Sequence, residues 1–215
     1  MTTLSMATTA IGDMSGISAL FVGENLIEDS YTLRLYAELS SGDRLNAVFG
    51  NGSNSITLQL SDGVSLYQHN FGGPTSTTVN SNLFPMVPSL EWDSYVTIGC
   101  LYSDGTPFGE NNLQSIGIDW TSFENGGGVE VNNGIWFVTP ADAQGEEIDG
   151  RVLIAQLTIL GGDIFADFQF SAGFRGKNAD GSAWQSVHSF AIIPAPCSLM
   201  LLGLTGLRHT RRRRT

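Results

Sequence analysis

The chain has 215 residues, a formal charge of −11 at pH 7, 14% charged residues and 26 glycines. Five of its ten basic residues, Arg208 and Arg211 to Arg214, lie in the last eight positions, so removing their charges leaves −16 for residues 1–207. An acidic body of this kind repels phosphate backbones and anionic lipid, which argues against nucleic acid as a partner. The length suits one large domain with a substantial core.

The N-terminal segment, residues 1–15, contains no visible export signal. A secretory signal needs a basic start and an apolar run of about 7 to 15 residues, but the first basic residue is Arg34. If the protein is exported, we expect residues 1–15 to be the remnant of a truncated signal peptide. Translation would then begin upstream of Met1, at a start that encodes basic residues and an apolar run.

The first third of the chain has the pattern of β-strands. Residues Tyr31 to Leu39 alternate between apolar and polar side chains, as a half-buried strand does. Arg44–Phe49, Ser55–Leu60 and Val64–His69 continue in the same style, separated by turn sequences rich in Gly, Asn, Asp and Ser. We therefore expect these four strands to form a meander.

Residues 71–93 are rich in Gly, Pro, Ser, Thr and Asn, which predicts a long surface loop or a crossover between sheets. Further strands are predicted at Tyr95–Leu101, Ser115–Trp120, Gly134–Thr139, Arg151–Leu160, Phe165–Ala172 and Ser186–Ile193. Many short strands without intervening helices indicate an all-β fold. We expect residues 16–190 to form a two-sheet antiparallel sandwich of jelly-roll type.

The C-terminal segment, residues 191–215, differs from everything before it. An apolar run from Ala191 to Leu207 is followed by the arginines 211–214. This predicts a short hydrophobic helix. As a helix the whole run would span about 25 Å, and Pro194 and Pro196 place the start of the helical part near Cys197, which makes it shorter still. The arginines hold its end at the cytoplasmic side because guanidinium groups resist crossing a bilayer. Since the hydrocarbon core is ~30 Å thick, transient insertion before cleavage fits better than permanent anchoring. A final core strand with a basic tip and a nucleic-acid-binding arm are the alternatives.

The tail as a whole resembles the PEP-CTERM sorting signal of Gram-negative, exopolysaccharide-producing bacteria. Pro194-Ala195-Pro196 stands where that family has Pro-Glu-Pro, and the apolar run and Arg211, Arg212, Arg213 and Arg214 follow in the family's order. The resemblance implies an exosortase as processing partner, transient membrane anchoring through the C-terminus and a final place in the cell envelope or outside the cell. Four body segments resemble a recurring secreted module with no assigned activity: Trp92–Gly99, Ile116–Trp120, Trp136–Pro140 and Val152–Leu157.

Residues that could carry catalysis are sparse in the body. Only His69 and His188 lie there, no Gly-x-Ser-x-Gly elbow occurs, and no zinc-ligand spacing is present. We expect both histidines at strand ends on the surface. Cys100, inside an apolar run, is expected to be a small buried residue.

The densest group of acids is Asp142, Glu146, Glu147 and Asp149, within the loop 141–150. Calcium favours several oxygens gathered by a turn that glycine permits, so this group is a candidate Ca²⁺ site. The loop lacks the spacing of known calcium loops, and a solvated hairpin tip is the alternative. No other cofactor is indicated.

Aromatic side chains supply the remaining candidate site. Sugar rings stack on indoles, and Trp184, in the polar loop 177–185, is expected to be the most exposed tryptophan, with Trp92 second. Trp120 and Trp136 are expected in the core. Packing of Trp184 under a long loop is the alternative to sugar binding.

These observations favour a non-enzymatic, exported protein of the cell envelope or extracellular matrix. A carbohydrate-binding module that interacts with exopolysaccharide is the main alternative, and a secreted hydrolase is the third. A sugar-binding module would present an exposed aromatic ring beside polar groups. A hydrolase would present two facing acids, or a nucleophile paired with histidine, in a cleft.

Overall fold

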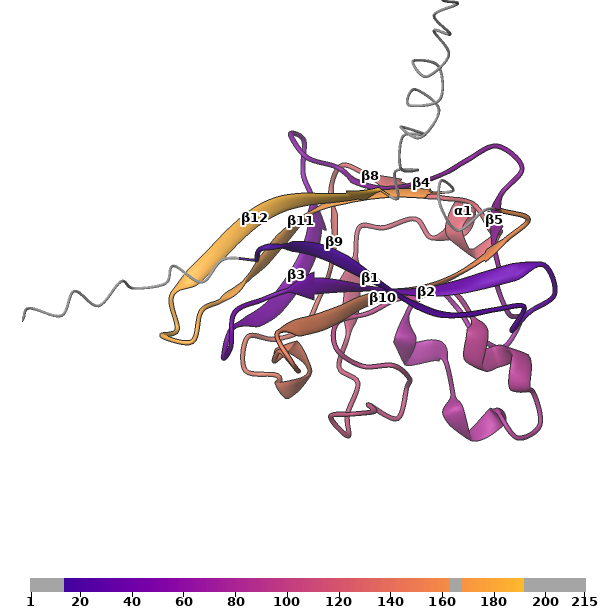
Figure 1. Ribbon diagram of the computed structural model, residues 1–215. Coiled ribbons are helices and arrows are strands. Elements are labelled where there is room, and N and C mark those ends of the chain that lie inside the picture. Colours follow the sequence, from indigo (N-terminus) through magenta and orange to yellow (C-terminus); the bar gives the residue numbers. More distant parts are fainter. Residues whose placement is uncertain (1–13, 163–167, 192–215) are drawn as a thin grey trace, which may run out of the picture.

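The computed structural model describes residues 14–162 and 168–191. They form two β-sheets packed face to face, and every pairing between named strands is antiparallel (Figure 1). The predicted two-sheet antiparallel sandwich is therefore confirmed, while jelly-roll connectivity stays a prediction. The predicted C-terminal helix, with Pro194 and Arg211 to Arg214, lies outside the described residues, as do residues 1–13.

The first sheet, sheet A, is built around two long central strands. Its members are β1 (Gly16–Glu24), β2 (Ser30–Glu38), β10 (Arg151–Leu160) and β5 (Ser65–Leu66) in that order, with β6 (Tyr95–Val96) also paired to β10. The alternation of β2 places Leu33 and Leu35 in the core between the sheets. Arg34 and Tyr36 consequently face away from the second sheet.

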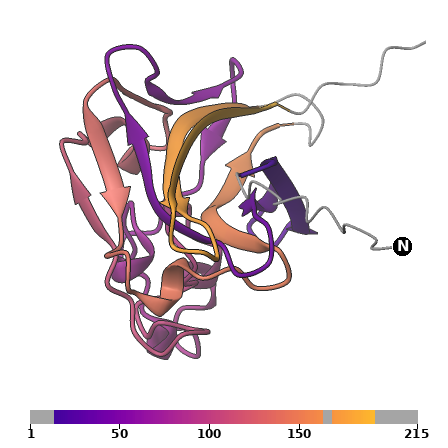
Figure 2. The same ribbon diagram turned by 90° about the vertical axis from the view of Figure 1, so that its left-hand side faces the viewer.

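The second sheet, sheet B, is centred on β11. Its members are β7 (Gln114–Ile116), β9 (Gly134–Phe137), β3 (Arg44–Gly50), β11 (Phe168–Lys177), β4 (Ile56–Leu60), β8 (Val129–Val131) and β12 (Ala183–Ala191). Figure 2 shows β11 and β12, coloured orange to yellow, as a long curved ribbon. Strand β12 pairs with β11 and lies beside β1 of sheet A, so the two sheets approach each other at this side.

Strands β3 and β4 do not form the hairpin that the meander prediction required. Both run antiparallel to β11 along one of its edges, β3 opposite Gly173 to Lys177 and β4 opposite Phe168 to Ser171. The turn sequence between them makes a local loop in which the Asn51 side chain accepts hydrogen bonds from two backbone N–H groups. The meander prediction is wrong, because this loop interrupts the strand without reversing it and β2 belongs to the other sheet.

The core between the sheets is dominated by large apolar side chains. Trp136, Phe123, Phe168 and Phe174 are among the largest of those that are fully buried. Phe123 comes from the short α-helix α1 (Thr121–Glu124). Trp136 also donates a hydrogen bond from Nε1 to the carbonyl of Thr97, at 3.2 Å, so its polar atom is satisfied inside the core.

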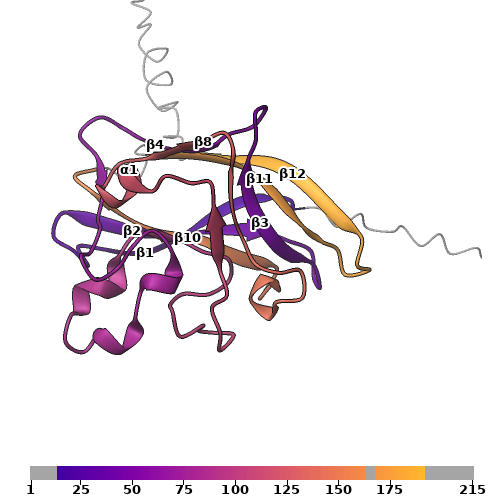
Figure 3. The ribbon, with the colours of Figure 1, turned by 180° about the vertical axis from the view of Figure 1, so that it is seen from behind.

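A third layer covers the outer face of sheet A. It consists of the long segment after β5, whose 3₁₀ turns are η1 (Ser76–Thr78), η2 (Ser81–Leu83) and η3 (Pro88–Trp92). In Figures 1 and 3 this magenta segment lies against β2 and β10, on the side away from sheet B. It has a small apolar cluster of its own around Val79, Leu90, Tyr95 and Tyr102. The predicted long loop is thus strand-free over residues 71–93 but is an ordered part of the fold.

Other strand predictions differ in extent. Val64–His69 and Tyr95–Leu101 shrink to the two-residue strands β5 and β6. Next to β6, backbone bonds to β10 continue from Thr97 and Gly99 to the carbonyls of Ile154 and Leu153, in irregular register because β10 bulges there. The prediction missed β1, β8 and α1.

Within the described ranges, no helix is long and apolar enough to span a bilayer. A short fourth 3₁₀ turn, η4, spans Ala143–Gly145.

Candidate binding pocket

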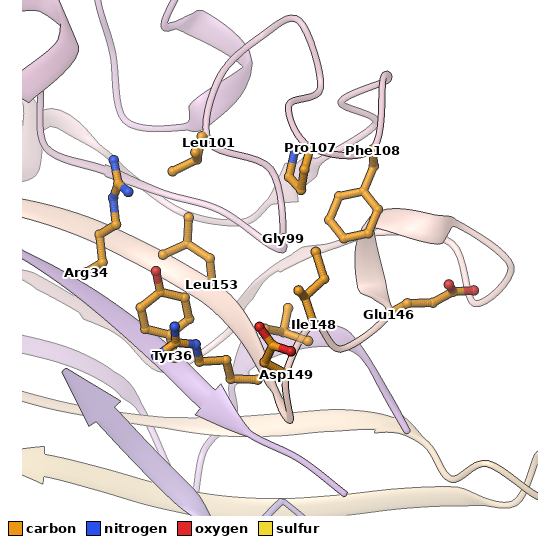
Figure 4. Close-up of a pocket in the computed structure, with 12 residues that line it drawn as sticks. Arg34, Tyr36, Gly99, Leu101, Pro107, Phe108, Glu146, Ile148, Asp149 and Leu153 are labelled. Carbon is orange, nitrogen blue, oxygen red and sulfur yellow. The ribbon is translucent and has the colours of Figure 1, made fainter. Parts of the chain in front are cut away.

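A pocket of about 170 Å³ opens where the outer face of sheet A meets two loops. Its floor is formed by β2 and the start of β10, and its walls by residues 99–108 and 146–149 (Figure 4). The lining residues are Arg34, Tyr36, Gly99, Leu101, Pro107, Phe108, Glu146, Ile148, Asp149, Arg151, Val152 and Leu153. This volume is sufficient for one ring-sized group.

The floor carries two cations because of the strand register. Arg34 and Tyr36 are two residues apart on β2 and therefore share its outer face. The register of β2 with β10 places Arg34 opposite Gln156, and Glu38 opposite Arg151. The polar face of one alternating strand thus becomes the base of the pocket.

Arg34 is held in place by buried neighbours. Its Nε donates to Oε1 of Gln156 at 3.0 Å, and its positive charge interacts with the hydroxyl of Tyr102. Gln156 is fully buried, and its amide donates to the carbonyls of Glu91 and Asp93 at 2.9 and 3.1 Å. The third layer therefore fixes Gln156, which in turn orients the guanidinium.

Arg151 does not pair with the acid opposite it. Its guanidinium carbon lies 4.5 Å from the ring centroid of Tyr36, a cation–π contact. Glu38 instead accepts a hydrogen bond from the hydroxyl of Ser18. The ion pair found among the described residues joins Arg44 and Glu146. Within that part of the chain, neither Arg34 nor Arg151 has a carboxylate partner.

Gln144 ties the two walls of the pocket together. It is fully buried; its amide donates to the carbonyl of Ile98 at 2.7 Å, and its Oε1 accepts from the backbone N–H of Asn112 at 2.6 Å. The backbone of Gly99 lies directly against that of Gln144: a Cβ on residue 99 would be 1.9 Å from the carbonyl oxygen of Gln144. The φ of Gly99 is also positive, at +73°. Glycine is therefore required at this crossing.

Charged side chains lie at both ends of the pocket, and one acid lies among the apolar side chains between them. In Figure 4, Arg34 lies at one end and Glu146 at the other, with Asp149 and Ile148 nearer the centre and Phe108 on the side opposite Tyr36. Glu146 is engaged by Arg44, whereas Asp149 is exposed on a turn with φ of +54°. The arrangement offers donors at one end, acceptors at the other and ring-sized apolar walls.

Asp93, at the base of the third layer, is a buried carboxyl with a structural role. It is fully inaccessible, and its two oxygens accept backbone N–H bonds from His69 at 2.7 Å and Gly73 at 3.1 Å. Burial raises its pKa from 3.8 to about 6, although these hydrogen bonds act in the opposite direction. The side chain closes the loop 69–73 and has no access to a substrate.

The other candidate reactive groups are similarly enclosed. Cys100 is fully buried, as predicted, and burial raises the pKa of its thiol to about 12, which keeps it protonated. His69 is half-buried in a loop, where its Nδ1 accepts from the backbone of Phe71 at 3.1 Å. His188 is half-buried within β12, so the prediction of a surface position at a strand end is wrong for it.

The four acids of loop 141–150 do not form a calcium site. Asp142 accepts from the N–H of Gln144 and from the amide of Asn112, and Glu147 accepts from the N–H groups of Gly42 and Gly150. Glu146 pairs with Arg44. Over residues 14–162 and 168–191, no three His, Cys, Asp or Glu side chains come together to hold a metal. That hypothesis is wrong because neighbouring groups disperse the carboxylates.

Trp184 is not the exposed aromatic that its polar surroundings predicted. It is 5% exposed and packs in the core from the inner face of β12. Gly176 on β11 makes room for it, since a Cβ there would lie 2.4 Å from the indole. A buried indole offers no platform for sugar, so this prediction is wrong. Trp92 is half-buried in η3 and does not line the pocket.

Of the pocket residues, sequence reasoning had singled out only Glu146 and Asp149, as calcium ligands, and it missed the others. The signal that could have found Arg34 and Tyr36 was their place on the polar face of the first predicted strand. Nothing local in the sequence linked them to Phe108 or Asp149.

Comparison with protein-family models and with curated proteins finds no match. Among solved structures, the chain is similar to the crystal structure of ACE19, the collagen binding subdomain of the Enterococcus faecalis surface protein ACE. The similarity covers 82% of this chain and 95% of that one, with 10% sequence identity and a TM-score of 0.35. The function is therefore argued from this chain's own residues.

Proposed function

We propose that this chain is an exported protein of the cell envelope or extracellular matrix, delivered by its C-terminal sorting signal and acting without catalysis. The observation that carries the proposal is the order of the C-terminal segments. Strand β12 ends at Ala191, and Pro194-Ala195-Pro196, the apolar run and the arginines 211–214 come directly after it. A sorting tail has to follow the folded body in this way, since the tail enters the membrane and the body stays outside.

The test expresses the full chain behind a secretory signal peptide in a Gram-negative host, with and without an exosortase. We expect a shortened body at the surface when the enzyme is present and an uncut, membrane-associated chain when it is absent. Changing arginines 211–214 together to glutamine should abolish processing, whereas the matched change to lysine, which keeps the charge, should retain most of it.

Two outcomes would contradict the proposal. One is a chain that stays uncut in both hosts. The other is equal processing of the glutamine and lysine variants, which would show that positive charge at this end does not matter.

A saccharide-binding role of the body is the second candidate, and the pocket favours it. Sugar sites combine apolar ring faces with a few fixed polar groups, and the pocket places Phe108 and Tyr36 beside Arg34, Arg151 and Asp149. The hydrolase alternative gains no support from Asp93 or from Cys100, because both are enclosed.

A further inference from the structure

We propose that the pocket over Arg34 and Arg151 binds a carboxylate-bearing sugar, a uronic acid residue set between neutral sugars in an extracellular polysaccharide. This inference deepens the saccharide-binding role above and rests on it. It assigns a ligand class to a pocket that consists of Arg34, Tyr36, Phe108, Asp149 and Arg151 together with their apolar neighbours.

Arg34 is the anchor for the carboxylate. A guanidinium has five N–H donors, and the one on Nε of Arg34 bonds Gln156 at 3.0 Å. The terminal N–H₂ groups remain for a ligand, and no carboxylate of the described residues lies within ion-pairing distance. An incoming carboxylate can therefore accept paired bonds from a guanidinium whose orientation is already fixed, so little side-chain entropy is lost on binding.

Arg151 supplies a second positive charge on the same floor. Its contact with the Tyr36 ring holds it beside the pocket without neutralising it. The chain as a whole has a charge of −11 and very few cations outside the tail, yet this one pocket contains two cations free of acidic partners. The pocket also contains two acids, but Glu146 is paired with Arg44, so two guanidinium groups remain to attract an anionic group of the ligand.

The remainder of the pocket suits a sugar ring. Phe108 and Ile148 offer apolar surface to the C–H faces of a ring, and Ile148 is 48% exposed without a ligand. Asp149, nearer the centre of the pocket, can accept hydrogen bonds from ring hydroxyls. Its charge, with that of Glu146, disfavours a second carboxylate, so the acid residue should have neutral neighbours.

The experiment compares two ligands that differ only in this carboxylate. Methyl β-glucuronoside and methyl β-glucoside are titrated separately into the ¹⁵N-labelled full chain at millimolar concentrations, and affinities are taken from amide shifts. We expect shifts around the pocket and about tenfold tighter binding of the glucuronoside, the size of one charge-assisted contact. Arg34→Gln should remove that preference. Arg175→Gln is the matched control. Arg175 is an exposed arginine on β11, which belongs to the other sheet, so this variant should keep the preference for the glucuronoside.

A further variant covers the case in which Arg34→Gln fails to fold. Phe108→Ala removes an apolar wall from a surface loop and should weaken both ligands about equally. Equal binding of the two ligands by the unaltered chain would overturn the uronic acid assignment while leaving saccharide binding in place. Binding of neither ligand would overturn both, without bearing on the sorting-signal proposal. Shifts confined to another part of the surface would also reject the pocket.

Discussion

Replacing Asp93 by asparagine should change how the stability of the protein depends on pH. The folded protein raises the pKa of this carboxyl from 3.8 to about 6 because it is buried. Since each pKa unit corresponds to about 1.4 kcal/mol, a shift of about 2 units amounts to about 3 kcal/mol. The folded state holds the proton more tightly than the unfolded chain does. Its contribution to stability is therefore complete below pH 3.8 and is lost as the pH rises through 6.

The assay is urea unfolding at several pH values from 4 to 7. Asparagine cannot ionise, so the variant should gain stability relative to the unaltered protein as the pH rises, by most of the 3 kcal/mol. At low pH it should be the less stable of the two, because its N–H₂ group would face the N–H of Gly73. Glu147→Gln is the control with the opposite sign: two backbone bonds lower the pKa of Glu147 from 4.5, so stability is lost there only as the pH falls. If the free energy of unfolding changed with pH by the same amount in the Asp93 variant and in the unaltered protein, the reasoning would be refuted.

Three further predictions concern enclosed positions. Gly72→Ala should destabilise the protein by about 1 to 3 kcal/mol in urea, because its Cβ would lie 1.7 Å from an Asp93 oxygen; unchanged stability would mean that the loop is free to move. Trp184→Ala should cost about 3 to 5 kcal/mol, measured by the same method, and a loss of under 1 kcal/mol would contradict its burial. In a Cys197→Ser background, Cys100 should not react with a thiol reagent at pH 8 until denaturant is added. Rapid labelling of the native protein would show that the thiol is accessible.

The alternating pattern of the sequence was sufficient to predict the all-β class and several strands. Periodicity of two is a local property, so Tyr31–Leu39 and Arg151–Leu160 matched β2 and β10 closely. Burial of Cys100 and Trp136 followed from the apolar runs around them. Tyr95–Leu101 kept the composition of a strand but little of its length, because its backbone bonds are divided between the bulged part of β10 and the loop residues Pro74 and Thr106.

The sequence by itself determined an acidic, strand-rich body and a distinct arginine-tipped end, because composition and periodicity are local properties of the chain. Only the tertiary structure decided that β3 and β4 share one edge of β11, that Gly176 admits the indole of Trp184, and that Phe108 and Arg34 line the same pocket. These features depend on which distant backbones approach each other. The packing of the whole sandwich determines which distant strands pair and where a glycine leaves room for a neighbour. The local sequence around each residue does not indicate either feature.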